Sequence, residues 1–282
     1  MFAFPIGVLL ESFKLPLAES LKLASQMGIR GLQVYATYGE RAPENMDAKK
    51  RKEFLDMVRG HGLTISALCG DLGKGFGNPE LNPQLMEKSK RILDMAKDLE
   101  TDIVTTHIGV VPEDPSHPRY RIMQDACGQL AEYAHSMDAH FAVETGPETA
   151  VTLKSFLDQF HSKGVAVNLD PANLKMVKDD DPVAAVYTLK DYIVHTHAKD
   201  GRMLYPRNPE EIYGIVQPME PVPSPSYEEV PLGEGDVPFK SYLQALEDIG
   251  YHGYLTIERE VGKQPEKDIQ TAVAYLTRLL SE

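Results

Sequence analysis

Apolar and polar positions form two kinds of segment that alternate from one end of the chain to the other. Short runs of apolar, often β-branched residues predict strands. Between these runs, apolar residues recur every three or four positions, which is typical of amphipathic helices. The runs predict eight strands: Ile6–Leu10, Gly31–Tyr35, Thr64–Leu68, Ile103–Thr106, Phe141–Val143, Val165–Leu169, Tyr192–Thr196 and Tyr254–Ile257.

Proline and glycine mark the ends of several predicted helices. Asn82-Pro83 begins a segment whose apolar face runs from Leu85 to Leu99. Pro238 begins another segment, which Gly250 closes. Proline in the first helical turn and glycine just past the last turn is the usual asymmetry of helices.

Eight alternations of strand and helix imply parallel strands that are joined by right-handed crossovers. The length of 282 residues is close to that of a single (β/α)8 barrel. A doubly wound open sheet gives a similar pattern, but no G-x-G-x-x-G motif follows the first strand. We therefore predict the α/β class and a single TIM-barrel domain over residues 1–282.

Residues 201–238 interrupt the alternation. This stretch follows the seventh predicted strand, contains eight prolines and shows no helical pattern. A connection of this length inside a compact domain is usually functional or disordered. We predict that it lies on the C-terminal face of the barrel, as a lid over the site or as a contact loop in a homo-oligomer, and that it does not link two domains.

The charge and the cysteines restrict the partners and the location. The chain has 42 acidic and 29 basic residues and a net charge of −13, so it should repel nucleic acids and anionic membranes. Basic clusters at residues 49–52 and 88–91 fall in helical patterns and should be solvated helix faces. The apolar run at the N-terminus is too short to cross a bilayer. The two cysteines lack C-x-x-C spacing, which suits a reducing compartment, and we predict a cytoplasmic protein.

Four metal-competent side chains end predicted strands. Glu144 follows Phe-Ala-Val, Asp170 follows Val-Asn-Leu, His197 follows Val-His-Thr, and Glu258 follows Leu-Thr-Ile. The first three are 26 and 27 residues apart, about one β/α unit each, and the last interval of 61 residues contains the proline-rich stretch. Active sites of TIM barrels form at the C-terminal ends of the strands. The four side chains should therefore meet at one rim.

Three carboxylates and an imidazole predict one bound divalent metal ion. This mostly oxygen donor set suits Mn²⁺, Mg²⁺ or Co²⁺ better than a closed structural zinc site, with zinc and iron also compatible. The competing interpretation is that each residue is a separate strand-end charge, which caps a helix or pairs with a neighbour. Four such residues in register favour the metal site.

Other polar residues near the same rim are candidates for substrate binding. His107 ends the fourth predicted strand, where it could bind a substrate hydroxyl or be a partly buried strand-end histidine, and Asn173 lies three residues after Asp170. Lys199 and Arg202 follow the seventh strand, where they could neutralise an oxyanion or a phosphate or remain solvated loop charges. His195 lies two residues before His197 on the same strand face and is expected to be a buried, hydrogen-bonded histidine. Glu148 and Glu260 are expected at the periphery or on the surface.

Five motifs carry a resemblance to a known family. They are Val-Glu-Thr-Gly-Pro, Asn-Leu-Asp-Pro-Ala-Asn, His-Thr-His-Ala-Lys-Asp-Gly, Val-Pro-Leu-Gly-Glu-Gly-Asp-Val and Tyr-Leu-Thr-Ile-Glu-Arg-Glu. With these motifs the chain resembles the xylose-isomerase-like TIM-barrel superfamily of sugar phosphate isomerases and epimerases over nearly its whole length. The family includes ketose 3-epimerases, inosose dehydratases, hydroxypyruvate isomerases and metal-dependent apurinic endonucleases.

The resemblance implies roles for the four rim residues. Glu144, Asp170, His197 and Glu258 match the family's metal ligands, and in the epimerase branch the two glutamates are also the acid/base groups. Asn173 stands where epimerases and endonucleases often have histidine, so the chain departs from the ketose 3-epimerase pattern. The endonuclease branch needs further histidine and aspartate ligands, but no Asp-x-His pair follows His197.

The resulting prediction is a metal-dependent isomerase or epimerase. It would act on a small carbohydrate, a ketose or a related polyol-carbonyl compound, by proton transfer through an enediolate between Glu144 and Glu258. An inosose-type dehydratase could use the same site. Two further hypotheses are a non-catalytic, metal-containing sugar-binding barrel and a metal-dependent endonuclease. Carboxylates on both sides of one metal favour an enzyme, because binding alone does not require them.

Overall fold

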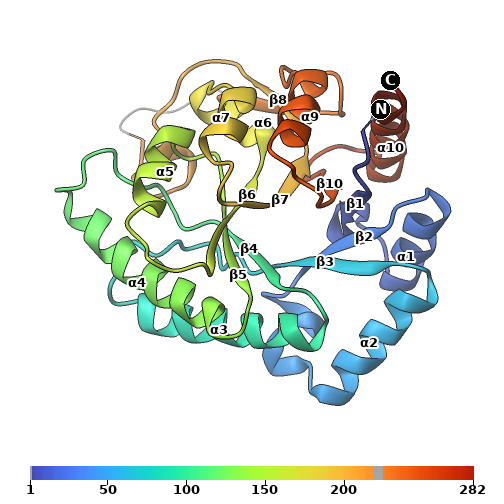
Figure 1. Cartoon of the computed structure of the whole chain (residues 1–282), viewed down its shortest axis with the longest axis horizontal. Coiled ribbons are helices and arrows are strands. Elements are labelled where there is room, and N and C mark those ends of the chain that lie inside the picture. The colour runs from blue at the N-terminus through green and yellow to red at the C-terminus, as the bar shows by residue number, and fades with distance from the viewer. Residues whose placement is uncertain (1, 219–224) are drawn as a thin grey trace.

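The computed structural model describes residues 2–218 and 225–282. In this part of the chain, eight parallel strands close into a barrel in the order β1-β10-β7-β6-β5-β4-β3-β2. Helices surround the barrel, and the two termini lie side by side, where the Phe2 N–H donates to the Leu280 carbonyl (Figure 1). This confirms the predicted (β/α)8 fold. The barrel strands are β1 (Ile6–Leu9), β2 (Gly31–Tyr35), β3 (Thr64–Cys69), β4 (Ile103–Thr106), β5 (His140–Glu144), β6 (Val165–Leu169), β7 (Ile193–Ala198) and β10 (Leu255–Ile257).

The barrel strands are nearly continuous apolar runs because both of their faces are buried, by the barrel interior and by the helices. All five residues of β6 are buried. The barrel closes where β1 pairs with β10, with Gly7 opposite Thr256. Gly31 on β2 allows Tyr254 to lie against the backbone, because a Cβ at this position would lie 2.5 Å from the tyrosine ring.

The helices follow the punctuation of the sequence. Proline occupies the first turn of α3, α4, α7 and α10, and the side chains of Asp47, Thr149 and Asp181 cap α2, α5 and α7. The predicted start at Pro238 is one residue early, since that residue precedes α9. The main helices are α1 (Leu17–Gln26), α2 (Ala48–Gly60), α3 (Asn82–Asp98), α4 (Pro118–His135), α5 (Ala150–Leu157), α7 (Pro182–Thr188), α9 (Phe239–Asp248) and α10 (Pro265–Ser281). Short α6 (Pro171–Asn173) runs into a π-helical turn (Leu174–Lys178).

The apolar faces of these helices pack on the outside of the barrel. Ile92, Leu93 and Ala96 of α3 are buried, as are Tyr242 and Leu243 of α9. Burying a large apolar side chain contributes about 1.5–3 kcal/mol. The helix faces that the periodicity predicted are therefore the ones that stabilise the barrel.

The proline-rich stretch is more regular than the sequence suggested. Its start, β8 (Asp200–Met203), pairs antiparallel with β9 (Tyr227–Val230), and α8 (Pro209–Ile212) is a short helix between them. The prediction of a stretch without helical structure is wrong for α8. The Asp200 carboxylate accepts N–H groups from Gly233, Gly235 and Val237, which ties both ends of the stretch together. Residues 219–224, with Pro221 and Pro223, lie outside the described residues.

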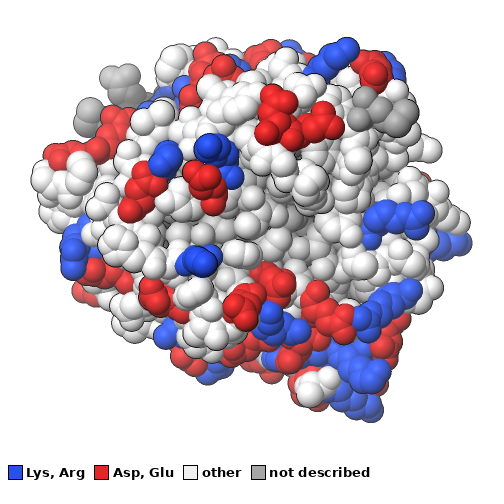
Figure 2. All heavy atoms as spheres, in the orientation of Figure 1, with Lys and Arg blue, Asp and Glu red and all other residues white. Residues whose placement is uncertain are grey.

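Charged side chains of both signs are mixed over the face shown in Figure 2, and basic residues gather over α2. There, Lys49 and Lys52 pair with Glu53 and Asp56 one helical turn away, as expected for a solvated helix face. Among the described residues, no helix is long and apolar enough to cross a membrane.

Candidate metal centre

The four predicted rim residues come from four adjacent strands. Glu144 is the last residue of β5, Asp170 follows β6, His197 is near the end of β7, and Glu258 follows β10. These strands are consecutive in the barrel. Parallel strands deliver their C-terminal residues to the same edge, so the four side chains meet there.

His197 Nδ1 is the centre of the cluster. It lies 3.1 Å from Asp170 Oδ2, 3.4 Å from Glu258 Oε2 and 3.6 Å from Glu144 Oε1. One ligand atom from each residue lies within 4.8 Å of the others. Asp170 and His197 are fully buried, and Glu144 and Glu258 are 7% exposed. Three carboxylates so close together in the interior need protonation or positive charge to offset their burial and mutual repulsion, and a divalent ion would supply such charge. The donor set and the spacing thus fit a divalent metal ion.

The cluster also perturbs the protonation of its members when no ion is bound. Burial raises the pKa of Glu144 to about 7, although His107 and His197 act against this rise. Burial also disfavours ionisation of Glu258, but the Lys199 and His197 cations hold its pKa well below the usual value. Burial opposes the charged form of His197, yet the Glu258 and Glu144 carboxylates raise its pKa well above that of a free histidine. A metal ion must therefore displace protons from this cluster.

Two polar residues inside the barrel orient the cluster, and the sequence reasoning missed both. Gln33 on β2 places its Oε1 2.8 Å from His197 Nε2, and its Nε2 donates to Thr105 Oγ1. With Nε2–H donating to Gln33, Nδ1 faces the carboxylates, and its lone pair would become available to a metal ion once the Nδ1 proton is displaced. Asn168 on β6 donates to Glu144 Oε2 at 3.1 Å. A buried polar residue two positions before Asp170, on the same strand face, was the available signal.

His195 has the structural role that was expected. Its Nδ1 lies 2.9 Å from Asn168 Oδ1, and its Nε2 lies 3.0 Å from Thr256 Oγ1. Burial holds its pKa well below the usual value, so the ring is neutral. It supports Asn168 from below the cluster.

Three of the four predicted substrate-binding residues surround the cluster. His107 Nε2 lies 3.4 Å from Glu144 Oε1, and Asn173 Nδ2 donates to the same oxygen at 3.0 Å. The buried Lys199 ammonium donates to Glu258 and to Glu260, at 2.8 Å each. The two glutamates of the cluster therefore have different neighbours.

Arg202 lies elsewhere. It belongs to β8, and its guanidinium donates to the Glu234 carbonyl. Within the described part of the chain it is not among the residues that line the cavity at the cluster. Its predicted contact with substrate therefore gains no support from this placement.

A cavity of about 200 Å³ opens directly onto the cluster. Besides Glu144 and Glu258 it is lined by His107, Asn173 and Lys199, as expected. Several other lining residues, which lie at or just after the ends of barrel strands or on the proline-rich stretch, were not predicted from the sequence: Tyr35, Cys69, Asp71, Tyr213 and Tyr227. Glu260 also lines the cavity, at its periphery.

Glu148 is not a surface residue. It follows β5 in the Glu-Thr-Gly-Pro-Glu stretch and is 4% exposed. Its Oε2 accepts the Val111 N–H at 3.2 Å, and its Oε1 has no hydrogen-bond partner among the described residues. Burial raises its pKa to about 8.

Comparison with known proteins places this geometry in context. The family model described as "xylose isomerase-like TIM barrel" matches residues 21–279. A xylose isomerase domain protein from Planctomyces limnophilus is 26% identical, with a TM-score of 0.79 over 98% of this chain and 96% of that one. The probable 3-DHS dehydratase AsbF of Bacillus anthracis is 17% identical, with a TM-score of 0.74 over 97% and 98%. A D-tagatose 3-epimerase-like protein is 18% identical, with a TM-score of 0.73 over 98% of both chains. The last two likenesses show the fold alone.

Proposed function

Because the chain belongs to the xylose isomerase-like TIM-barrel family, we propose that it is a divalent-metal-dependent sugar isomerase or epimerase. The observation that carries the proposal is the position of the two glutamates. Glu144 and Glu258 approach His197 Nδ1 to 3.6 and 3.4 Å from strands that are separated by two others. Both also line the cavity at the cluster. A substrate in that cavity would lie between two carboxylates.

Glu144, Asp170, His197 and Glu258 would hold the ion. Mn²⁺, Mg²⁺ and Co²⁺ suit three carboxylates and one imidazole, and zinc and iron are also compatible. A divalent ion supplies a Lewis acid that polarises a substrate carbonyl. Gln33 and Asn168 would keep the ligand atoms of His197 and Glu144 in place, as outer hydrogen bonds commonly do around metal sites.

The two glutamates would move the proton. One removes it from the carbon next to the substrate carbonyl, and the other returns it. Return to the opposite face of the same carbon gives an epimer, whereas delivery to the neighbouring carbon converts an aldose into a ketose. His107 and Asn173 contact Glu144, whereas Lys199 donates to Glu258. Each glutamate thus has its own partners to fix its orientation.

Dehydration is a second candidate, because the same two glutamates could remove a proton and assist the loss of a β-hydroxyl group. The likeness to the probable 3-DHS dehydratase supports it at the level of the fold. A barrel that only binds a metal and a sugar would need neither glutamate to change its protonation state.

Solvent exchange tests the proposal. In D₂O, the metal-loaded protein should incorporate deuterium beside the carbonyl of at least one ketose, aldose or inosose. Glu144→Gln and Glu258→Gln keep an oxygen ligand but cannot act as bases, so exchange should fall about 10²–10⁴-fold even at saturating metal. Glu132→Gln, on the exposed face of α4, is the matched control. Undiminished turnover by both variants at the cluster would contradict the two-base mechanism.

A further inference from the structure

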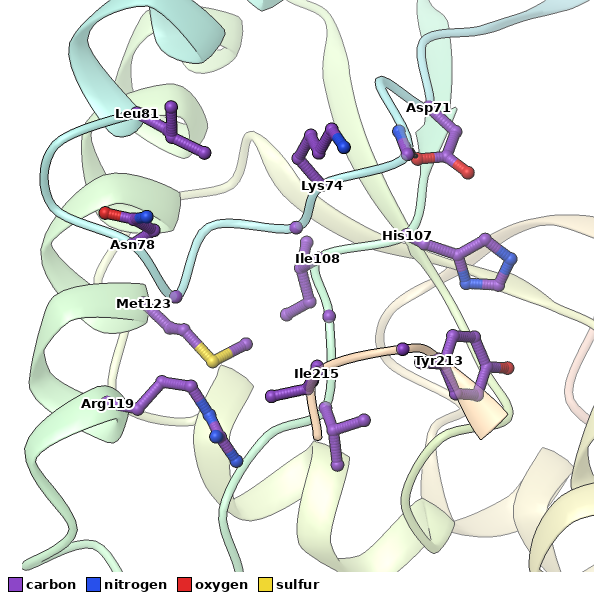
Figure 3. A pocket seen from close by; sticks show the side chains of 16 residues that line it. Asp71, Lys74, Asn78, Leu81, His107, Ile108, Arg119, Met123, Tyr213 and Ile215 are labelled. Atoms are coloured by element: carbon purple, nitrogen blue, oxygen red, sulfur yellow. Dashed lines mark hydrogen bonds between the residues drawn. The ribbon is translucent and has the colours of Figure 1, made fainter. Parts of the chain in front are cut away.

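A second, larger cavity adjoins the one at the cluster. This outer chamber has a volume of about 490 Å³. It shares Asp71, His107 and Tyr213 with the cavity at the cluster, so these three residues form the boundary between the two spaces. In Figure 3, His107 and Tyr213 lie on one side of the chamber, and Arg119 and Met123 lie on the opposite side.

One part of the wall of the outer chamber is a glycine-rich loop that packs against the residues that follow β4. The Phe76 N–H donates to the Ile108 carbonyl at 2.8 Å. At Gly75, where φ is +59°, a Cβ would lie 2.6 Å from that carbonyl oxygen. At Gly77, a Cβ would lie 2.7 Å from Arg119 Cδ. Glycine is therefore needed at both positions, because any side chain would separate the loop from the end of β4 and from Arg119.

Arg119 is the most unusual polar group of the outer chamber. Its guanidinium donates to Glu210 of α8, which fixes one end of it. Its Nε is buried and has no acceptor among the described residues. That atom is closed off from the chamber, but the side chain as a whole is 17% exposed and lines it, and the two Nη groups carry more N–H donors than the bond to Glu210 uses. The chamber therefore offers a positioned donor next to the apolar side chains of Ile108 and Ile215.

The charges favour an uncharged ligand over a phosphate. Arg119 is neutralised by Glu210, and the other charged groups of the wall, Lys74 and Asp71, have opposite signs. With Glu210 counted, two positive and two negative charges balance around the chamber, so a phosphate would gain no net attraction, whereas a sugar ring offers hydroxyl acceptors at its edge and apolar C–H faces. The cavity at the cluster, at about 200 Å³, is smaller than the 300–1,000 Å³ usual for ligand pockets.

We propose that the outer chamber binds a second sugar ring, so that the substrate is a disaccharide whose reacting unit lies at the metal cluster. This rests on the proposed function for the position of the reacting unit. Another cleft, of about 520 Å³, also reaches Asp71 and Tyr35. It is the less suitable extension, because it is not lined by His107, which lies 3.4 Å from Glu144, or by Tyr213, which packs against His107.

Calorimetric titration of the Mn²⁺-loaded protein tests the proposal. D-Fructose is compared with turanose, lactulose and palatinose, in which a second ring is attached at different carbons of fructose. At least one disaccharide should bind about tenfold more tightly than fructose, or better. Arg119→Ala removes the donor and Ile215→Trp fills the chamber. Both should reduce the disaccharide affinity to that of fructose without changing fructose or Mn²⁺ binding. Tyr38→Ala, in the other cleft, is the matched control and should keep the preference.

Three results would overturn the proposal. One is that no disaccharide binds more tightly than fructose, including no measurable binding of either. Another is a preference for D-fructose 6-phosphate that Arg119→Ala abolishes, which would make the chamber an anion site. The third is a disaccharide preference that survives Ile215→Trp but is lost in Tyr38→Ala. Affinity ratios do not depend on turnover, so a failure of solvent exchange would refute the proposed function and leave this result to be judged separately.

Discussion

Replacing Glu148 with glutamine should stabilise the fold, and the gain should grow with pH. The carboxylate is 4% exposed, keeps one hydrogen bond to Val111 N–H and leaves Oε1 without a partner among the described residues. Burial raises its pKa from 4.5 to about 8. Glutamine has nearly the same shape, can still accept the Val111 N–H, and carries no charge to bury.

The sign and size follow from the two pKa values. At pH values between 4.5 and about 8, the Glu148 carboxyl is protonated in the folded protein and ionised in the unfolded chain. The contribution of this group to the free energy of unfolding is therefore fully present below pH 4.5 and is lost as the pH rises to about 8. At 1.36 kcal/mol per pKa unit, the accumulated loss at pH 8 is several kcal/mol. Glu148→Gln should therefore gain about 3 kcal/mol more at pH 8 than at pH 5. That is a large part of the 5–15 kcal/mol typical of a whole domain.

Urea denaturation followed by circular dichroism at the two pH values measures this difference. Glu132→Gln, on the exposed face of α4, controls for the general effect of removing one negative charge from an acidic protein. The reasoning would be refuted if the free energies of unfolding of the wild type and of Glu148→Gln differed by the same amount at pH 5 and at pH 8. It would mean that the carboxylate does not change its ionisation on folding in this pH range.

Other predictions concern the cluster and its support. Asp170→Ala removes a fully buried carboxylate from the cluster, and elemental analysis of protein purified without chelator should find little bound metal. Asn168→Leu leaves the ligands intact but removes the hydrogen bond to Glu144, so metal affinity measured by competition with a chelator should fall about 10–100-fold. Replacing residues 205–225 with a short glycine-serine loop removes Tyr213 from the cavity; the barrel should keep its circular dichroism spectrum and release metal to a chelator faster. Gly164→Ala places a methyl group against the Ala131 carbonyl, and the melting temperature should fall by an amount equivalent to about 1–3 kcal/mol or more.

The barrel and the cluster could be predicted because both depend on local pattern. Eight buried strands give eight apolar runs, and the closure of the barrel brings their ends together whatever the details of packing. Glu144, Asp170, His197 and Glu258 end strands that are neighbours along the chain and in the barrel. The boundaries of five strands differ from the prediction by one or two residues, and in β5 the polar residues His140 and Glu144 continue the strand at its two ends.

The rest depends on contacts between residues far apart in the sequence. Gln33 is 164 residues from His197, so nothing in its own segment indicates that it orients the histidine. The pairing of β8 with β9 joins strands on either side of a long insertion, and such pairing leaves no signal in local periodicity. The pattern also could not show that Arg202, in that pairing, is directed to the Glu234 carbonyl.

The neighbours of the two glutamates constrain how the proposed chemistry can be divided between them. Lys199 donates to Glu258, and an ammonium at 2.8 Å favours the ionised carboxylate. Glu144 instead receives amide donors from Asn168 and Asn173, which stabilise a carboxylate less than a full positive charge does. At the position three residues after Asp170, asparagine cannot exchange a proton with Glu144, so a proton that Glu144 accepts has the substrate or His107 as its next partner. The asymmetry gives the two carboxylates different tendencies to hold a proton, and proton transfer across a substrate requires such a difference.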